Sequence, residues 1–338
     1  MNNWLITGGA GFIGQHLTER LLSADKKFNV IIIDNLSNSE NIQSEDPIRR
    51  KLNFNKRSLK FFKEDIRNKE ALTQIIKDQS IDVCVHLAAK VSIPESIKNP
   101  DDTIDINVKG TTCLLEACSA SRVKTFIFAS SAAVYGRIQA LPVSEKHIPE
   151  PLSVYGASKV AGEALVSAYG NTKRIKNAVS LRIFNVYGRN QTSRYAGVVT
   201  RFASRLSKGK PPIIYGDGKQ TRDFISVHDV VNSIMAASKL TERREKQKKE
   251  KTSQDYEKFS FGTCHSIFNI GSGLPTSVCS LATTMIKIYG ADLQPLFHNK
   301  ENKGEIKYIY TDISKARRFL GFKPEENVER GIRNMLNL

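Results

Sequence analysis

The stretch Leu5-Ile6-Thr7-Gly8-Gly9-Ala10-Gly11-Phe12-Ile13-Gly14, close to the start of the chain, decides the fold. Its apolar beginning predicts a β-strand over residues 3–7, and the leucines spaced along 17–22 predict a helix directly after the glycines. Glycines at positions 8, 11 and 14 allow a tight turn, a close approach of the backbone to a pyrophosphate, and packing of the helix on the strand. The free N–H groups and the positive dipole end of that helix favour phosphate. The stretch therefore predicts a strand–loop–helix unit that holds a dinucleotide.

A carboxylate at the end of the second expected strand selects between dinucleotides. Asp34 lies 20 residues after Gly14 and ends the apolar run 29–34. A carboxylate at this place accepts hydrogen bonds from both hydroxyls of an adenosine ribose and repels a 2′-phosphate. We therefore expect NAD as the cofactor rather than NADP. The alternative is that Asp34 is only a turn residue before Asn35.

Short β-type runs alternate with helical segments over the first 185 residues. The expected strands are 3–7, 29–34, 59–63, 81–87, 124–130 and 177–184. This rhythm predicts an α/β fold with a doubly wound parallel sheet of the Rossmann type, covered by helices on both faces. We expect a NAD-binding domain over 1–185, to which part of 225–240 returns. The remainder, 186–338, is expected to form a smaller C-terminal substrate lobe with a lysine-rich insertion at 241–261.

Composition narrows the class of protein. The 338 residues are 40% hydrophobic and carry a formal net charge of +17. A net +4 of this surplus lies in the mixed-sign run 243–251, which a solvated surface loop explains better than a nucleic-acid patch, so no nucleic-acid partner is expected. The five cysteines form no CxxC pair, and no metal site is expected. No stretch approaches the roughly 20 apolar residues of a membrane helix, and no charged leader with an apolar run precedes the first strand, so we expect a cytoplasmic protein without membrane contact.

A tyrosine and a lysine are spaced for acid–base chemistry in Tyr155-Gly156-Ala157-Ser158-Lys159. On a helix, positions four residues apart share one face. A phenol with a pKa of about 10 is a poor base at neutral pH. A nearby ammonium group, together with a positive nicotinamide ring, favours the phenolate and lowers that pKa. We expect Tyr155 to take the proton of a substrate hydroxyl with Lys159 beside it.

These motifs occur in the order typical of one family: the chain resembles the extended short-chain dehydrogenases/reductases of the NAD-dependent epimerase/dehydratase type. The matching blocks are 7–14, 34–36, 65–67, 86–89, 107–111, 126–136, 155–159, 181–188 and 215–224. The resemblance runs nearly end to end and leaves out only 241–261. It implies NAD, a nucleotide-sugar substrate, and a homodimer formed through helices that fall here at about 100–119 and 153–169.

The resemblance also implies roles for individual residues. The implied cofactor contacts are Gly8, Gly11, Phe12, Ile13, Gly14, Asp34, Asn35, Asp65, Ile66, Leu87, Ala88, Ala89, Asn107, Tyr155 and Lys159. The implied catalytic residues are Ser131, Tyr155 and Lys159, and the implied substrate contacts are Ser131, Asn185, Val198 and Arg222. Arg222 would pair with the diphosphate, for which a guanidinium fork is suited; the alternative is an ion pair with Asp223 or Asp229.

Two alanines discriminate between reactions. Related 4,6-dehydratases carry an acidic pair directly after the residue that corresponds to Ser131, whereas this chain has Ala132 and Ala133. Neither methyl group can move a proton, so elimination of water lacks its acid and base. The resemblance then implies NAD-dependent epimerisation at C4 through a 4-keto sugar, with UDP-glucose, UDP-galactose or their N-acetyl forms as substrates. The alternatives are an epimerase of another nucleotide sugar such as UDP-glucuronate, with Lys90 or Arg182 serving the carboxylate, and a non-catalytic NAD-binding regulatory protein.

One position departs from the family pattern, and another does not decide whether an N-acetyl sugar is accepted. Asn302 stands where an arginine commonly provides a second phosphate ligand, with Lys300 and Lys303 beside it. Ile309 falls where the family's side chain influences access for an N-acetyl group, and isoleucine selects neither form.

Overall fold

The computed structural model describes residues 2–24, 28–37, 58–191, 197–241, 265–299 and 306–337. The expected insertion at 241–261, apart from its first residue, and the departure at Asn302 lie outside these ranges. Within the described ranges, no helix is long and apolar enough to cross a membrane.

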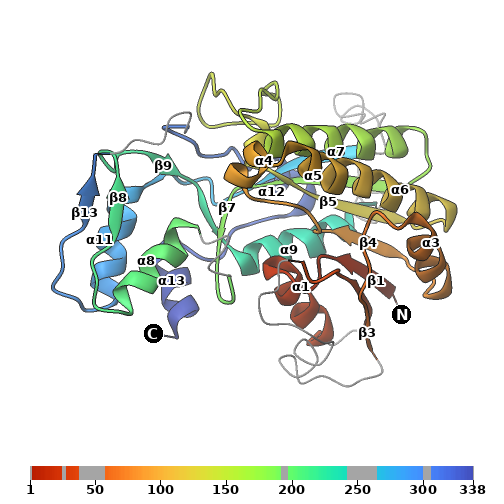
Figure 1. Ribbon diagram of the computed structural model, residues 1–338, viewed down its shortest axis with the longest axis horizontal. Coiled ribbons are helices and arrows are strands. Elements are labelled where there is room, and N and C mark those ends of the chain that lie inside the picture. The colour runs from red at the N-terminus through yellow and green to blue at the C-terminus, as the bar shows by residue number, and fades with distance from the viewer. Residues whose placement is uncertain are drawn as a thin grey trace, which may run out of the picture.

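A seven-stranded sheet forms the centre of the molecule (Figure 1). Its strands are β1 (Asn2–Thr7), β2 (Phe28–Ile33), β3 (Leu59–Phe62), β4 (Val83–His86), β5 (Thr125–Ser131), β6 (Asn177–Ile183) and β11 (His265–Ile270). They lie in the order β11-β6-β5-β4-β1-β2-β3, and every neighbouring pair is parallel. Reading from β3 to β6, this is the 3-2-1-4-5-6 order of the doubly wound dinucleotide-binding sheet. The predicted fold class is confirmed.

Helices cover the two faces because side chains alternate along each strand. In β1, Trp4 and Ile6 belong to one apolar cluster and Leu5 belongs to another. The first cluster is closed by α1 (Phe12–Leu22), α9 (Val227–Ser238) and α12 (Ser314–Leu320). The second is closed by α3 (Lys69–Asp78), α6 (Gly110–Ala120) and α7 (Val154–Asn171).

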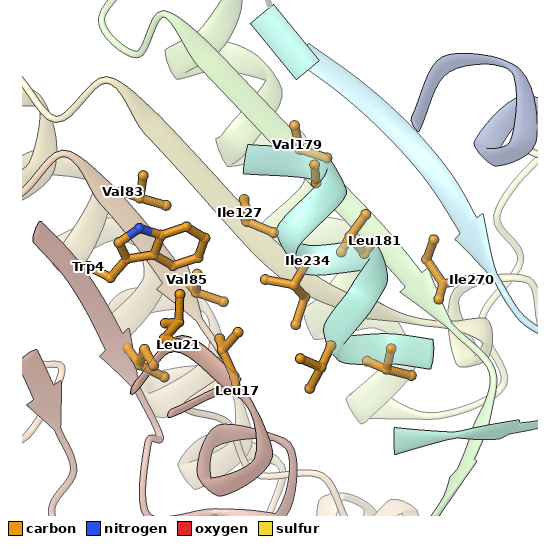
Figure 2. Close-up of a cluster of buried hydrophobic side chains, with 14 of the residues drawn as sticks. Trp4, Leu17, Leu21, Val83, Val85, Ile127, Val179, Leu181, Ile234 and Ile270 are labelled. Carbon is orange, nitrogen blue, oxygen red and sulfur yellow. The ribbon is translucent and has the colours of Figure 1, made fainter. Parts of the chain in front are cut away.

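The cluster under α9 and α1 shows how the sheet is held (Figure 2). Ile234 projects from α9 towards Ile127 and Leu181 on the strands, while Leu21 of α1 lies beside Trp4. All five side chains are at most 2% exposed. Burying an aliphatic side chain of this size stabilises the fold by roughly 1.5–3 kcal/mol.

Segments from the second half of the chain complete the first domain. Helix α9 returns to the sheet, within the expected range 225–240. Strand β11 and helix α12 also join it, although they lie in the stretch expected to form the second lobe. The reason is the outer edge of β6, which accepts β11 in parallel register from His265 beside Ala178 to Ile270 beside Ile183. The two parts of the molecule therefore interleave along the chain.

The smaller lobe lies at one end of the sheet (Figure 1). Its helices are α8 (Val198–Leu206), α11 (Val278–Ile288) and α13 (Val328–Leu336), which share an apolar cluster. Its short strands pair as β7 (Asn185–Tyr187) with β10 (Phe224–Ser226), β8 (Ile213–Tyr215) with β13 (Leu296–His298), and β9 (Thr221–Arg222) with β12 (Thr276–Ser277). Shorter helical turns lie beside α6 and before α7: α4 (Ile93–Lys98), α5 (Pro100–Ile104), the π-helix η1 (Asp105–Lys109) and the 3₁₀ turn η2 (Ala132–Val134).

Candidate active site

The expected site residues gather at one edge of the sheet. Because all strands of the sheet are parallel, their carboxyl ends lie together, and ligands of doubly wound sheets bind at this edge. The glycine loop follows β1, Asp34 follows β2, residues 87–89 follow β4, and Ser131 ends β5. One strand ladder is continued here by Leu87 N, which donates to Thr7 O at 3.1 Å.

The glycine loop is tightly packed at the positions expected to need glycine. Gly8 has a φ of +70°, and a Cβ added there would lie 2.7 Å from the backbone nitrogen of Ala88. A Cβ on Gly14 would lie 2.5 Å from the carbonyl oxygen of Gly8. Helix α1 begins after Gly11 with neither a side-chain cap nor an acidic residue in its first turn. Its first N–H groups therefore face a loop whose backbone can approach a phosphate closely.

Asp34, expected to bind the adenosine ribose, is hydrogen-bonded to the glycine loop. Its Oδ2 accepts a hydrogen bond from Ala10 N at 3.0 Å, and its Oδ1 accepts one from Leu36 N at 2.8 Å. Burial raises the pKa of this carboxyl group, and the two backbone hydrogen bonds oppose the rise. Since each carboxylate oxygen can accept two hydrogen bonds, both oxygens keep capacity for ribose hydroxyls. The turn with Leu36 and a ribose-binding role are compatible.

Asp65 belongs to a cluster of charged side chains. Arg67 binds both of its oxygens, at 2.9 and 2.8 Å, and also pairs with Asp105 at 2.6 Å. Hydrogen bonding to Arg67 lowers the pKa of Asp65 to about 2. Asn35 donates to Asp65 at 2.9 Å, so two of the expected cofactor residues are in direct contact. The neighbouring Ile66 is 5% exposed and packs against Gly110, where a Cβ would lie 2.6 Å from its Cδ1.

Asn107 fixes the segment after 87–89. It lies in η1 and is 2% exposed. Its Oδ1 accepts from Lys90 N at 2.8 Å, and its Nδ2 donates to Lys90 O at 2.9 Å and to Ser158 Oγ at 2.9 Å. Both polar atoms of the Asn107 side chain are therefore hydrogen-bonded to other residues of the protein. Asn107 therefore holds the loop that lines the expected cofactor path and joins it to α7.

Ser131, Tyr155 and Lys159 come together from β5 and α7. Lys159 lies 6.0 Å from the centre of the Tyr155 ring and donates to Ala129 O at 2.7 Å, so its ammonium group is held against β5. Tyr155 is 9% exposed and Lys159 is 4% exposed. Ser131 is hydrogen-bonded to the Tyr155 side chain, and its Oγ also accepts from Ala133 N at 3.2 Å. The sequence motif thus forms one cluster.

Burial dominates the electrostatics of this cluster. It raises the pKa of Tyr155, and the hydrogen bond with Ser131 opposes the rise. Burial lowers the pKa of Lys159 to about 8, against the attraction of Glu163. The expected lowering of the Tyr155 pKa is therefore not produced by the chain alone, because loss of water outweighs the hydrogen bond.

The backbone of α7 comes close to the Ser131 loop because two of its residues lack a side chain. A Cβ on Gly156 would lie 2.5 Å from Ala133 O, and a Cβ on Gly162 would lie 2.4 Å from the Phe128 ring. Ser153 caps the helix by accepting from Gly156 N at 3.0 Å. The helix therefore starts at a fixed place, one residue before Tyr155.

The expected substrate residues lie on elements of the smaller lobe. Asn185 begins β7, and its Nδ2 donates to Asp223 O at 3.2 Å. Val198 begins α8. Arg222 is partly buried in β9, and its Nη1 donates to Thr221 O at 2.8 Å. Ile309 is 4% exposed and packs with Val134, Tyr135, Val143 and Phe184, which lie behind the Ser131 loop.

The two basic residues considered for a sugar carboxylate already have acidic partners. Arg182 is 3% exposed and binds Glu163 through two hydrogen bonds, at 2.9 and 2.7 Å. Lys90 pairs with Asp102 at 3.0 Å.

Several residues near the cluster were not anticipated. Glu163 follows Lys159 by one helical turn, Ser130 donates to Glu163 Oε1 at 2.6 Å, and Ser96 accepts from Tyr155 N at 3.2 Å. For Glu163 the sequence holds a signal: an acidic residue at the i+4 position from a catalytic lysine lies on the same buried face of the helix. For Ser96, which is 59 residues from Tyr155, the local sequence holds none.

Comparisons with known proteins agree over the whole chain. The family model for GDP-mannose 4,6 dehydratase matches residues 5–335. A Methanocaldococcus jannaschii protein with the provisional name UDP-glucose 4-epimerase is 37% identical over 98% of this chain and 97% of its own length.

Two solved structures have the same fold at similar identity. The UDP-glucose 4-epimerase of Thermotoga maritima, solved with UDP-glucose, is 30% identical with a TM-score of 0.82, covering 99% of this chain and 97% of that one. The UDP-glucuronic acid 4-epimerase of Bacillus cereus, solved with UDP-glucuronic acid and NAD, is 31% identical with a TM-score of 0.81, covering 99% of this chain and 98% of that one.

Proposed function

We propose, from the premise that this chain belongs to the GDP-mannose 4,6 dehydratase family of short-chain dehydrogenases/reductases, that it is an NAD-dependent 4-epimerase of a UDP-linked sugar. The observation that carries the proposal is the cluster of Ser131, Tyr155 and Lys159 beside the glycine loop, in a chain with Ala132 and Ala133 directly after the serine. The cluster can move a proton at a sugar hydroxyl, and the alanines provide no acid or base for elimination. Reversible oxidation and reduction at one carbon is the chemistry that remains.

The three residues of the cluster have different roles at the sugar. Tyr155 takes the proton of the 4-hydroxyl as base and returns it later as acid. Ser131, hydrogen-bonded to Tyr155, orients the reacting oxygen. Lys159 provides a positive charge near the phenol, which favours the phenolate that burial alone disfavours. Their low exposure keeps water from the reacting carbon.

The cofactor side of the site fits NAD. The N-terminus of α1 after the glycine loop would hold the pyrophosphate, Asp34 the adenosine ribose, and Tyr155 with Lys159 the nicotinamide end. The packing of Gly8 and Gly14 shows that this loop has room for backbone only. When bound, NAD supplies reversible hydride transfer at C4, which creates a 4-keto sugar and then an alcohol of either configuration. The relative solved with NAD supports this assignment.

The substrate we propose is UDP-glucose or UDP-galactose, or their N-acetyl forms. Asn185, Val198 and Arg222 lie on elements of the smaller lobe, and we propose that they contact the UDP part. A cation without an acidic partner would favour the carboxylate of a uronic acid. Arg182 is committed to Glu163 and Lys90 pairs with Asp102, which makes UDP-glucuronate the less suited substrate.

An NMR assay of the purified protein tests the function. We expect interconversion at C4 when UDP-glucose, UDP-galactose or UDP-N-acetylglucosamine is supplied separately with NAD. UDP-glucuronate in a fourth tube distinguishes the alternative substrate. If all four sugars remain unchanged while the protein binds NAD tightly, the proposal fails in favour of a non-catalytic NAD-binding protein.

We also propose a homodimer that acts in the cytoplasm. Helix α7 exposes Ala157, Ala164 and Ala168 along one side, while Ile97 on α4 and Ile104 on α5 are 63% and 42% exposed. Small side chains on a helix allow a second helix to pack closely, and the exposed isoleucines gain from being covered. The free, buried thiols of Cys84 and Cys118 suit a reducing compartment.

The dimer is tested by light scattering coupled to size-exclusion chromatography. We expect twice the mass of the 37.8 kDa chain for the unaltered protein and the monomer mass for Ala164→Arg. Thr283→Arg, at an exposed position of α11, provides the control and should leave the mass unchanged. A monomeric unaltered protein, or a dimer that survives Ala164→Arg, contradicts this interface.

A further inference from the structure

A buried ion pair lies directly behind the catalytic lysine. Glu163 is four residues after Lys159 on α7, hence on the same face of the helix. Arg182 on β6 binds it through Nε to Oε1 at 2.9 Å and Nη2 to Oε2 at 2.7 Å. Their side chains are 3% exposed for the arginine and 6% for the glutamate. The hydroxyl of Ser130 donates to Oε1 at 2.6 Å and completes the set.

Stability alone does not account for this pair. Two charges removed from water lose hydration that their mutual attraction repays only in part, and well-packed apolar side chains often replace such pairs without loss. The bidentate geometry does, however, hold the Glu163 carboxylate in one place. In a dry interior this carboxylate also acts on a charge one helical turn away, although the Arg182 cation offsets part of its field.

Lys159 is that charge. The residue is 4% exposed, and its ammonium group donates to Ala129 O at 2.7 Å and lies 4.8 Å from the centre of the Phe128 ring. Burial lowers its pKa to about 8, and the attraction of Glu163 opposes the lowering. A lysine that titrates near neutral pH would lose its charge readily if that attraction were removed.

We propose that Glu163 is a positioning residue for the reaction: it keeps Lys159 in the ammonium form beside Tyr155, and Arg182 and Ser130 hold the carboxylate for this task. The inference rests on the proposed function, in which the charge of Lys159 favours the Tyr155 phenolate. It assigns Glu163 no contact with the sugar or with NAD.

The other titratable groups around Lys159 do not share its pH range. His86 on β4 faces the ammonium group, and burial, with the charge of Lys159, lowers its pKa to about 3. Burial raises the pKa of Tyr155 on α7 above its ordinary value of 10. Glu163 makes a bidentate ion pair with Arg182 on β6, whose guanidinium lies 4.8 Å from the Tyr135 ring centre. Of His86, Tyr155 and Lys159, the lysine therefore has the pKa nearest to neutral pH.

The direct test is a pH titration of lysine labelled with ¹³C at Cε, followed by NMR in the full-length protein. Lys159→Met identifies the signal of Lys159. We expect the midpoint to fall by about one pH unit in Glu163→Gln, since a nearby opposite charge typically shifts a pKa by 1–3 units. Tyr135→Phe is the matched control: it removes a hydroxyl that donates to Asn269 at 2.6 Å and contacts Arg182, but it leaves both charges of the Glu163–Arg182 pair in place, so the midpoint should not move.

The kinetic counterpart is the pH profile of kcat for C4 epimerisation. Its alkaline limb should move down by the same one unit in Glu163→Gln and remain in place in Tyr135→Phe. An unmoved midpoint and limb in a folded Glu163→Gln overturns the inference while leaving the function intact. Failure of the function instead appears as absent turnover in the unaltered protein, and the titration still reports on Glu163 in that case.

Removing the glutamate charge alone leaves Arg182 buried without compensation and can prevent folding. The double variant Glu163→Gln/Arg182→Met removes both charges and is the second route. If this variant unfolds at the temperature of the unaltered protein and the Lys159 midpoint has fallen, the role of Glu163 is supported. If the midpoint stays in place, the pair is merely structural.

Discussion

At the residue scale, burial and hydrogen-bond partners determine whether each ionisable side chain of this site is charged. Tyr155 and Lys159 are both nearly inaccessible, and burial pushes each towards its neutral form. Asp65 shows the opposite case, in which hydrogen bonds to Arg67 outweigh burial and stabilise the anion. The charge of each group therefore depends on its immediate partners, and we expect that removing a single polar atom changes the rate of the reaction.

The phenol oxygen of Tyr155 provides the clearest such change. Tyr155→Phe removes the proton acceptor but keeps the ring, so NAD binding and fold should be retained. General acid–base catalysis contributes about 10²–10⁴-fold, and we expect kcat to fall by that factor. Steady-state epimerisation by NMR measures the loss, and the NAD content of the purified variant is the control. A variant with near-normal turnover would remove Tyr155 from its proposed role.

His86 makes stability depend on pH. Its ring bridges Thr7 at 2.7 Å and Thr111 at 2.9 Å, and burial lowers its pKa from 6.5 to about 3. Below pH 6.5 the unfolded chain binds a proton that the native protein does not. Stability is therefore present above 6.5 and is lost as the pH falls towards 3, on the order of a few kcal/mol.

Urea unfolding between pH 7 and 4 measures this dependence. His86→Gln should be less stable at pH 7, because it loses hydrogen bonds, but its stability should fall less steeply with acid. Some slope remains, since burial also lowers the pKa of His265 to about 4. His298→Gln, at an exposed position, should keep the full slope. Equal slopes for His86→Gln and the unaltered chain would contradict the assignment.

Residue-level prediction from sequence succeeded where partners are close along the chain. Tyr155 and Lys159 share a helix face through their spacing, and they meet Ser131 as expected. Glu163 finds Arg182 19 residues away and Ser130 33 residues away, and only the pairing of β5, β6 and α7 brings these together. No local pattern contains that information.

At the scale of elements, the helix expected over 100–119 is interrupted in a way that the spacing of its apolar residues does not predict. It is divided into α5, the π-helix η1 and α6. The π-turn contains Asn107, whose side chain holds both backbone groups of Lys90 and reaches Ser158. Single π-turns often occur at functional sites. The six expected strands lie within two residues of the observed ones, because each follows a dense apolar run.

The joint between the glycine loop and α1 gives a prediction for this element. Gly14→Ala would place a Cβ 2.5 Å from Gly8 O and 2.6 Å from Gly9 Cα, so the helix must move off the loop. We expect a loss of about 1–3 kcal/mol and of most bound NAD. Calorimetry and the absorbance of released cofactor measure the two effects.

Gly290→Ala is the matched control for this substitution. Gly290 has a φ of +61° with nothing within 4 Å of an added Cβ. Backbone strain of about 1 kcal/mol should result, with NAD retained. Equal retention of NAD in both variants would show that the loop tolerates the shift.

Across the whole molecule, the two lobes are not consecutive pieces of chain. Strand β11 and helices α9 and α12 complete the first sheet from the second half of the sequence. The predicted boundary near 185 marks where the rhythm of strands and helices stops. It does not mark where the domain is finished, because an edge strand such as β11 looks the same in sequence whichever sheet it joins.

A fragment of residues 1–185 should therefore fail to fold alone. It would leave the outer edge of β6 unpaired and the apolar face of α1 without α9. We expect circular dichroism to show no cooperative thermal transition for this fragment. Co-expression with 186–338 should restore a complex that unfolds cooperatively. A fragment that melts sharply by itself would falsify the view that the sheet needs its late strands.

The late arrival of β11 also matters during synthesis on the ribosome. Roughly 80 residues separate the end of β6 from the start of β11, and translation at about 5–20 residues per second takes about 4–16 s to cross them. Throughout that interval the nascent chain presents an open, apolar strand edge to the cell. Such an edge is a template for wrong pairing with other chains. The order of strands along the chain therefore leaves the outer edge of β6 open until β11 has been made.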